Sequence, residues 1–173
     1  MNFKKQVYIL AVVESLQANG SWTGKTHVNK ALSLLRDYAK VDVPFNFVLY
    51  KHGPYSFDIE AELEQMQSYG ALTVDPDAQG FGVTLQTGEM ADFVHENAEL
   101  PAATVKAIEN VCSFVGSRNV AELERLATAS WIRTREGISE PKQVAKRLNR
   151  LKPHVSLEEA EQAYSEISTW LTS

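Results

Sequence analysis

The chain has 173 residues, of which 44% are hydrophobic and 23% charged, and its 17 Lys and Arg against 22 Asp and Glu give a net charge of −5. This is the composition of an ordinary globular protein, and it argues against intrinsic disorder and a fibrous fold. The longest uncharged apolar run, residues 7–13, is far shorter than the roughly 20 residues that a membrane-spanning helix needs, so we expect no membrane partner.

The cysteine content and the N-terminus indicate the cellular setting. The single cysteine, Cys112, cannot form an intrachain disulfide or a cysteine-rich metal site, and we expect it to be a small core residue. The apolar run near the N-terminus meets Glu14 and no small-residue cleavage site, which is not the pattern of a signal peptide. The expected location is therefore the cytoplasm.

The first predicted elements are two helices and a strand. Apolar residues at three- and four-residue steps predict helices over residues 3–18 and about 25–39. Pro44 excludes continuation, and the aromatic and β-branched run 45–50 predicts a strand. His52-Gly53-Pro54 then predicts a turn.

A helix and a hairpin are expected next. Ile59, Leu63 and Met66 share a helical face within residues 55–69. Short runs at residues 71–74 and 81–85 are separated by the turn-forming segment 75–80, which predicts an antiparallel hairpin. A short helix over about residues 87–97 follows, and Glu99-Leu100-Pro101 is the candidate boundary between two halves.

The remainder of the chain is predicted to be helical. Apolar spacing predicts one helix from Pro101 to about Val115 and another from about Val120. The final pair is predicted over residues 143–151 and 157–171, and the last helix opens with the capping box Ser156-x-x-Glu159. Asn119 and Glu122 have the same spacing at the start of the helix before that pair.

These elements predict a mostly helical α+β fold with a winged-helix-like N-terminal half, residues 1–98, and an all-helical C-terminal half, residues 99–173, packed on it as one compact unit. The order helix, helix, strand, helix, hairpin is that of a winged helix-turn-helix domain. In such a domain the helix before the hairpin occupies the recognition position.

No catalytic constellation is visible, so we expect no enzyme, no catalytic residue, no metal and no cofactor. The histidines His27, His52, His95 and His154 are scattered without the spacing of a metal site. Gly24-Lys25-Thr26 resembles the end of a phosphate-binding loop, but Asn19 stands where the first glycine is required.

The segment 49–56 is the densest group of aromatic, basic and turn-forming residues in the chain. One interpretation is structural, with glycine and proline making a sharp connection from strand to helix. The other is functional: Lys51, His52 and Tyr55 form an exposed cluster that binds an anionic group of a partner.

A family resemblance appears in this region. Asn29 to Leu35 in the second helix, Tyr50-Lys51-His52-Gly53-Pro54-Tyr55-Ser56, and then Leu63 with a hairpin after Tyr69-Gly70, resemble the Panacea-type antitoxins, small phage-associated bacterial proteins, and their uncharacterised relatives. The resemblance covers about residues 1–90. It departs from the family by the insertion of Lys51-His52 between the tyrosine and Gly-Pro, which is closer to the uncharacterised relatives. It implies a regulatory or partner-binding module in a bacterial toxin–antitoxin or phage-defence system.

Charge is distributed unevenly along the chain. Residues 56–100 contain ten acidic residues and no Lys or Arg, which disfavours DNA binding by the predicted recognition helix and wing, because phosphate contacts require cations. Residues 118–152 contain nine basic and four acidic residues. This basic segment either pairs with acidic parts of the chain, docks an acidic protein, or binds nucleic acid.

The sequence therefore predicts a non-enzymatic module that acts by protein–protein interaction. The expected partner is a protein encoded nearby, and the sequence is also compatible with a homo-oligomer. The expected contact residues are Lys51, His52, Tyr55, Arg133, Arg135, Arg147 and Arg150. A first alternative is a nucleic-acid-binding regulator that uses the basic C-terminal helices. A second alternative is a small enzyme with a site near His52.

Overall fold

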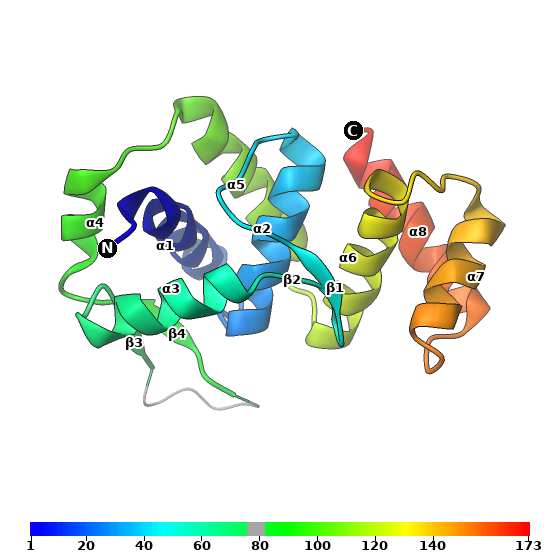
Figure 1. Cartoon of the computed structure of the whole chain (residues 1–173), viewed down its shortest axis with the longest axis horizontal. Coiled ribbons are helices and arrows are strands. Elements are labelled where there is room, and N and C mark those ends of the chain that lie inside the picture. The colour runs from blue at the N-terminus through cyan, green and yellow to red at the C-terminus, as the bar shows by residue number, and fades with distance from the viewer. Residues whose placement is uncertain (76–81) are drawn as a thin grey trace. The chain divides into compact units, whose positions relative to one another are not determined.

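The computed structural model describes residues 1–75 and 82–173, which form a mostly helical α+β fold (Figure 1). The described residues contain eight helices and two small antiparallel hairpins. Contacts divide the chain into two compact units. Unit 1 comprises residues 1–47 and 56–117, and unit 2 comprises residues 48–55 and 118–173.

Three long helices build the core of unit 1. The helices α1 (Phe3–Ala18) and α2 (Lys25–Ala39) have the bounds that the apolar spacing predicts. The helix α5 (Ala102–Val115) packs against both of them. Leu10, Leu32 and Val111 are among the residues that this packing removes from solvent, which is the main favourable contribution to folding.

The helix α3 (Phe57–Ser68) begins two residues later than predicted. Asn29 of α2 fixes the residue before it: the Asn29 amide Nδ2 donates to the Ser56 carbonyl at 3.2 Å, and the Ser56 backbone N–H donates to Asn29 Oδ1 at 3.1 Å. Both residues are buried, so the amide satisfies backbone groups that water does not reach.

The second hairpin consists of β3 (Leu72–Val74) and β4 (Leu85–Thr87), with Leu72 opposite Thr87 and Val74 opposite Leu85. An antiparallel hairpin is confirmed, but β4 begins where the predicted strand 81–85 ends. The predicted turn falls almost wholly on residues 76–81, outside the described residues.

The helix α4 (Ala91–Asn97) is shorter than predicted because Thr87 still belongs to β4. Gly88 follows and donates its backbone N–H to the Ala71 carbonyl at 2.9 Å. A Cβ at Gly88 would lie 2.2 Å from the Gly70 oxygen, so only glycine allows this close approach.

Unit 2 consists of a hairpin and three helices. The helices are α6 (Val120–Thr134), α7 (Pro141–Leu151) and α8 (Leu157–Leu171), each in contact with the other two. The hairpin is formed by β1 (Val48–Tyr50) and β2 (Gly53–Tyr55), and β2 packs on α6.

The turn predicted at His52-Gly53-Pro54 lies earlier in the structure, because the connection is Lys51-His52 and Gly53 and Pro54 belong to β2. Both strands of a two-stranded ribbon are edges, where proline is tolerated although it donates no ladder hydrogen bond. Gly53 has φ 90°, a conformation that glycine adopts readily and that lets the strand leave a tight connection.

The two predicted capping motifs differ in the structure. Ser156 and Glu159 form the complete capping box at α8, since the Ser156 side chain accepts from Glu159 N–H and the Glu159 carboxylate accepts from Ser156 N–H. Asn119 accepts from Glu122 N–H at 2.9 Å, but its own side-chain amide donates to the Glu122 carboxylate. The second motif is therefore only half of a box.

The compact units do not follow the expected halves 1–98 and 99–173, since α5 groups with α1 and α2 and the first hairpin groups with α6. Packing of the two halves as one compact unit stays a prediction. None of the helices in residues 1–75 and 82–173 has the length and hydropathy to cross a bilayer.

Candidate functional site

Unit 2 contains every residue that the sequence nominates for partner contact. Three lie on the first hairpin although the chain places them far from the basic helices, and four lie on or directly after α6 and α7. In order, they are Lys51, His52 and Tyr55, then Arg133, Arg135, Arg147 and Arg150.

The hairpin presents an exposed face made of Val48, Tyr50 and Tyr55, which we call the aromatic face. Val48 lies opposite Tyr55, and Tyr50 two residues on points to the same side because strand side chains alternate. Val48 and Tyr50 are 45% and 46% exposed, and the Tyr50 and Tyr55 ring centroids lie 5.8 Å apart. The opposite side carries Pro54, which is buried.

Lys51 extends the aromatic face with a positive charge. Its Nζ lies 5.8 Å from the centroid of the Tyr50 ring, within the range of a cation–π interaction. Lys51 itself is exposed. The hairpin thus combines apolar, aromatic and cationic groups at one exposed place.

The tip of the hairpin is held by a group of charged side chains around Glu124 of α6, which we call the Glu124 cluster. Glu124 Oε1 lies 2.9 Å from Lys152 Nζ and 3.7 Å from His154 Nε2, and Oε2 lies 3.4 Å from His52 Nδ1. Lys152 Nζ also donates to the Lys51 carbonyl. One lysine therefore joins the carboxylate to the backbone of the hairpin connection.

The Glu124 cluster combines a buried ion pair with two exposed histidines. Glu124 and Lys152 are only 8% and 5% exposed, whereas the His52 and His154 side chains are 71% and 69% exposed. Burial by itself raises the pKa of the Glu124 carboxyl, but the hydrogen bond and charge of Lys152, together with His52, outweigh it, so the net pKa lies below its ordinary value. Glu124 is therefore ionised at neutral pH, and the cluster orients the hairpin.

Three of the four nominated arginines interact with other side chains of unit 2. Arg147 donates through Nε and Nη2 to the two Glu136 oxygens at 2.9 and 3.0 Å, and this hydrogen bonding raises its pKa. Arg133 donates to the Ser168 hydroxyl. The Arg135 guanidinium lies 5.5 Å from the centroid of the Trp131 ring. Arg147 and Arg133 thus connect elements of the unit.

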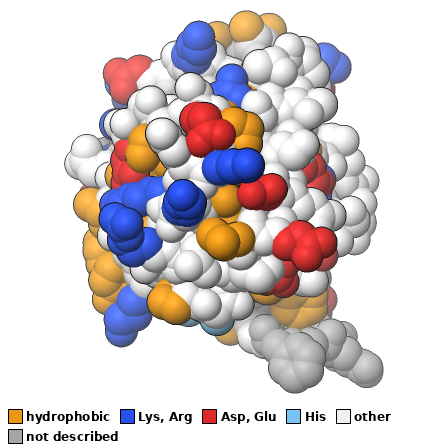
Figure 2. All heavy atoms as spheres, turned by 90° about the vertical axis from the view of Figure 1, so that its right-hand side faces the viewer, with side chains coloured by type: hydrophobic (Ala, Val, Ile, Leu, Met, Phe, Trp, Pro, Cys, Tyr) orange, Lys and Arg blue, Asp and Glu red, His pale blue; other side chains and the backbone are white. Residues whose placement is uncertain are grey.

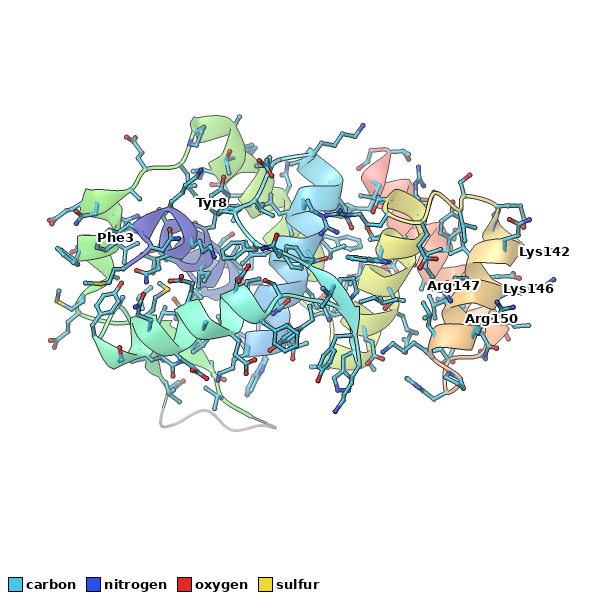
Figure 3. All side chains as sticks on the ribbon, in the orientation of Figure 1. Phe3, Tyr8, Lys142, Lys146, Arg147 and Arg150 are labelled. Carbon is cyan, nitrogen blue, oxygen red and sulfur yellow. The ribbon has the colours of Figure 1, made fainter. Side chains whose placement is uncertain are left out.

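The fourth arginine belongs to a cationic row that the sequence reasoning did not single out. Lys142, Lys146 and Arg150 occupy every fourth position of α7, so they lie along one side of it (Figure 3). All three are exposed, and within the described residues none of them forms an ion pair. Figure 2, which looks onto the side where α7 lies in Figure 1, shows a group of Lys and Arg side chains on this surface. The four-residue spacing was the signal in the sequence.

The remaining candidates for chemistry are the thiol of the single cysteine and a metal site. Cys112 is fully buried in unit 1, as expected of a core residue, and burial raises the pKa of its thiol to about 11 although Ser15 acts in the opposite direction. A thiol that is protonated at neutral pH is a poor nucleophile. Across residues 1–75 and 82–173, no group of three or more His, Cys, Asp or Glu is arranged to hold a metal ion.

Comparisons with known proteins assign the chain to no family. No protein-family model matches the chain, and a search of curated proteins gave no match either.

Proposed function

We propose that this protein is a non-enzymatic regulatory module that acts by binding another protein through the aromatic face of the first hairpin. One observation carries the proposal: two large apolar side chains, Val48 and Tyr50, remain nearly half exposed on a two-stranded ribbon beside Lys51. Tyrosine is enriched at protein interfaces because its ring contributes apolar area and its hydroxyl can still form hydrogen bonds.

The anchoring of the hairpin supports this proposal. An isolated two-stranded hairpin is marginally stable in water, so an unanchored one would lose conformational entropy on binding. Here Lys152 ties the Lys51 carbonyl to the buried Glu124, and β2 packs on α6. The aromatic face is therefore ordered before a partner arrives, which favours affinity.

The antitoxin-like role in a bacterial toxin–antitoxin or phage-defence system comes from the resemblance of residues 1–90, and the winged-helix-like assignment from the order of the elements. The acidic residues of α3 support a protein partner over DNA at the recognition position. Asp58 is 3.8 Å from Lys5 of α1, and Glu62 accepts a hydrogen bond from Gln6, but Glu64 is exposed and presents negative charge to solvent. Such a surface repels phosphates.

The experiment is quantitative affinity purification from the native host with wild type and the double variant Val48→Ser/Tyr50→Ser. The matched control is Val120→Ser, which removes a valine of equal exposure, 45%, at the start of α6. If the aromatic face binds the partner, the double variant loses at least about tenfold of the captured partner, as expected when interface anchors are removed, and Val120→Ser captures it like wild type. Equal capture by all three proteins would contradict the proposal.

Nucleic-acid binding is a second candidate because Lys142, Lys146 and Arg150 form an exposed row without ion pairs among the described residues. Phosphate contacts by such a row make affinity fall steeply with salt. A gel shift that weakens with salt and disappears in Lys146→Glu/Arg150→Glu would favour it. Arg147 is unsuited to that test because its reversal would also break the pair with Glu136.

An enzyme near His52 has less support, since the His52 imidazole is 71% exposed and lies against Glu124.

A further inference from the structure

A hollow of unit 1 with a volume of about 820 Å³ lies between α1, α5 and the connection from α4 to α5. We call it the α1–α5 groove; its three bounding elements can be followed in Figure 1. This volume lies within the range of pockets that bind organic ligands or the side chains of a docked segment.

The floor of the groove is apolar because of residue spacing on α1. Val7, Ala11 and Ala18, together with Ser15, follow one another at helical steps on one side of the helix, and three of the four side chains are small. Across the groove, α5 contributes Val105 and Ile108. Val105 is 39% exposed and Ala18 is also exposed, so these two side chains are open to a partner, whereas Ile108 is only 2% exposed and lies beneath them.

The edge of the groove is acidic. Among its lining residues, Glu14, Glu99 and Glu109 carry negative charge, and the only basic side chain is His95, whose Nε2 lies 3.0 Å from Glu14 Oε1. Lys106 stands outside the groove, 3.6 Å from Glu109, but both side chains of that pair are more than half exposed, so solvent screens it. Unit 1 as a whole has 14 acidic and 7 basic residues, which strengthens the negative field.

From this apolar floor with an acidic edge, we infer that the α1–α5 groove docks a basic amphipathic helix of a partner protein, with its apolar side chains on Val105 and Ala18 and its Lys or Arg residues beside Glu99 and Glu109. Laying the apolar side of a helix into such a groove is a recurrent mode of peptide recognition. The charge at the edge selects a basic segment over an acidic one, because like charges across an interface disfavour binding. The site lies in unit 1 and is independent of the aromatic face.

The test uses the full-length protein and fluorescein-labelled, Ala-rich peptides of about 20 residues, a length and composition that favour a helix, with leucines at positions i, i+3, i+4 and i+7. One peptide carries four Lys on its polar side, and its match carries four Glu at the same positions. Fluorescence anisotropy then gives the dissociation constant of each. We expect saturable binding of the Lys peptide and at least about tenfold weaker binding of the Glu peptide, in line with edge-charge complementarity.

Three variants locate the binding. Glu99→Lys/Glu109→Lys reverses the exposed edge and is expected to weaken the Lys peptide about fivefold or more, since each exposed pair contributes modestly. Ala18→Trp fills the exposed end of the floor and is expected to weaken it about tenfold by occupying the space of an anchor side chain. Glu64→Lys changes one exposed charge on α3, outside the groove, and is expected to leave the constant within twofold.

The opposite results would overturn the inference. These are no saturable binding of the Lys peptide, equal binding of the Glu peptide, or equal weakening by Glu64→Lys and by the groove variants, which would indicate attraction to net charge alone. Concentration-dependent self-association that Ala18→Trp abolishes would assign the groove to a second copy of the chain. Val48→Ser/Tyr50→Ser is expected to bind the peptide like wild type, so this result and the test of the aromatic face can fail separately.

Discussion

The segment 48–56 is held at two places by different chemistry. In unit 2, the hairpin tip at Lys51-His52 is held by the charged Glu124 cluster, in which Lys152 bonds to both Glu124 and the Lys51 carbonyl. At its end in unit 1, Ser56 is held by two hydrogen bonds from the neutral amide of Asn29. The tip is therefore anchored in a way that depends on ionisation, and the anchor at Ser56 is not.

This difference bears on how the aromatic face can be regulated. A buried ion pair is costly to break from one side, because the remaining charge has no partner in a poorly solvated place. It also depends on pH, whereas amide hydrogen bonds to the backbone do not change between acidic and neutral solution. The order of the aromatic face thus depends on keeping Glu124 ionised.

The largest expected effect is that of Lys152→Met. It leaves Glu124 buried with only the exposed His52 and His154 near it, and we expect the free energy of unfolding to fall by about 3 kcal/mol in urea denaturation. The matched control is Lys146→Met, an exposed lysine of α7 that is expected to change stability by less than about 0.5 kcal/mol. The double variant Glu124→Gln/Lys152→Met should lose less than the sum of the single losses, and additive losses would show that the two side chains do not interact.

Asn29→Ala tests the neutral anchor and is expected to cost about 2 kcal/mol, because the Ser56 N–H and carbonyl, both buried, would lose their partner. Hydrogen exchange should show the change at the start of α3. Asn97→Ala removes an exposed amide whose partner among the described residues is the Phe93 carbonyl, and it serves as the control. A loss no larger than that of Asn97→Ala would mean that the two hydrogen bonds between Asn29 and Ser56 contribute little to stability.

The smallest expected effect is on the pH dependence of the unfolding free energy. The pKa of Glu124 lies below its ordinary value of 4.5, so the stability it contributes is present above pH 4.5 and is lost as the pH falls through the lower folded-state value. We expect the unfolding free energy of wild type to fall in that range relative to Glu124→Gln, which lacks the titrating group, and the curve of Asn29→Ala to run parallel to wild type. Parallel curves for wild type and Glu124→Gln would contradict the charged anchor.

Local sequence patterns predicted many of the helices, but they could not predict contacts between residues far apart in the chain. The apolar spacing of α1, α2 and α8 and the Ser156 capping box act within a few residues, so they could be found in the sequence. The hairpin 48–55 was missed because Gly53-Pro54 has the composition of a turn, and only pairing with residues 48–50 shows it to be a strand.

For the site too, the sequence predicted some of the residues but not the contacts between them. Lys51 and Tyr55 were nominated from local composition, but nothing in the sequence links His52 to Glu124, 72 positions away, or Lys152 to the Lys51 carbonyl. For the same reason, Arg147 was nominated as a contact residue although Glu136 holds it with two hydrogen bonds. Exposed charge and internally paired charge look alike until the fold brings their partners together.

The most direct measurement of the central claim is hydrogen–deuterium exchange of the protein, free and in complex with the partner that co-purifies from its native host. If the aromatic face is the binding surface, amides of residues 48–55 exchange more slowly in the complex, and Val48→Ser/Tyr50→Ser abolishes this slowing together with capture. Unchanged exchange over residues 48–55, with protection confined to α7 or to the α1–α5 groove, would contradict the account.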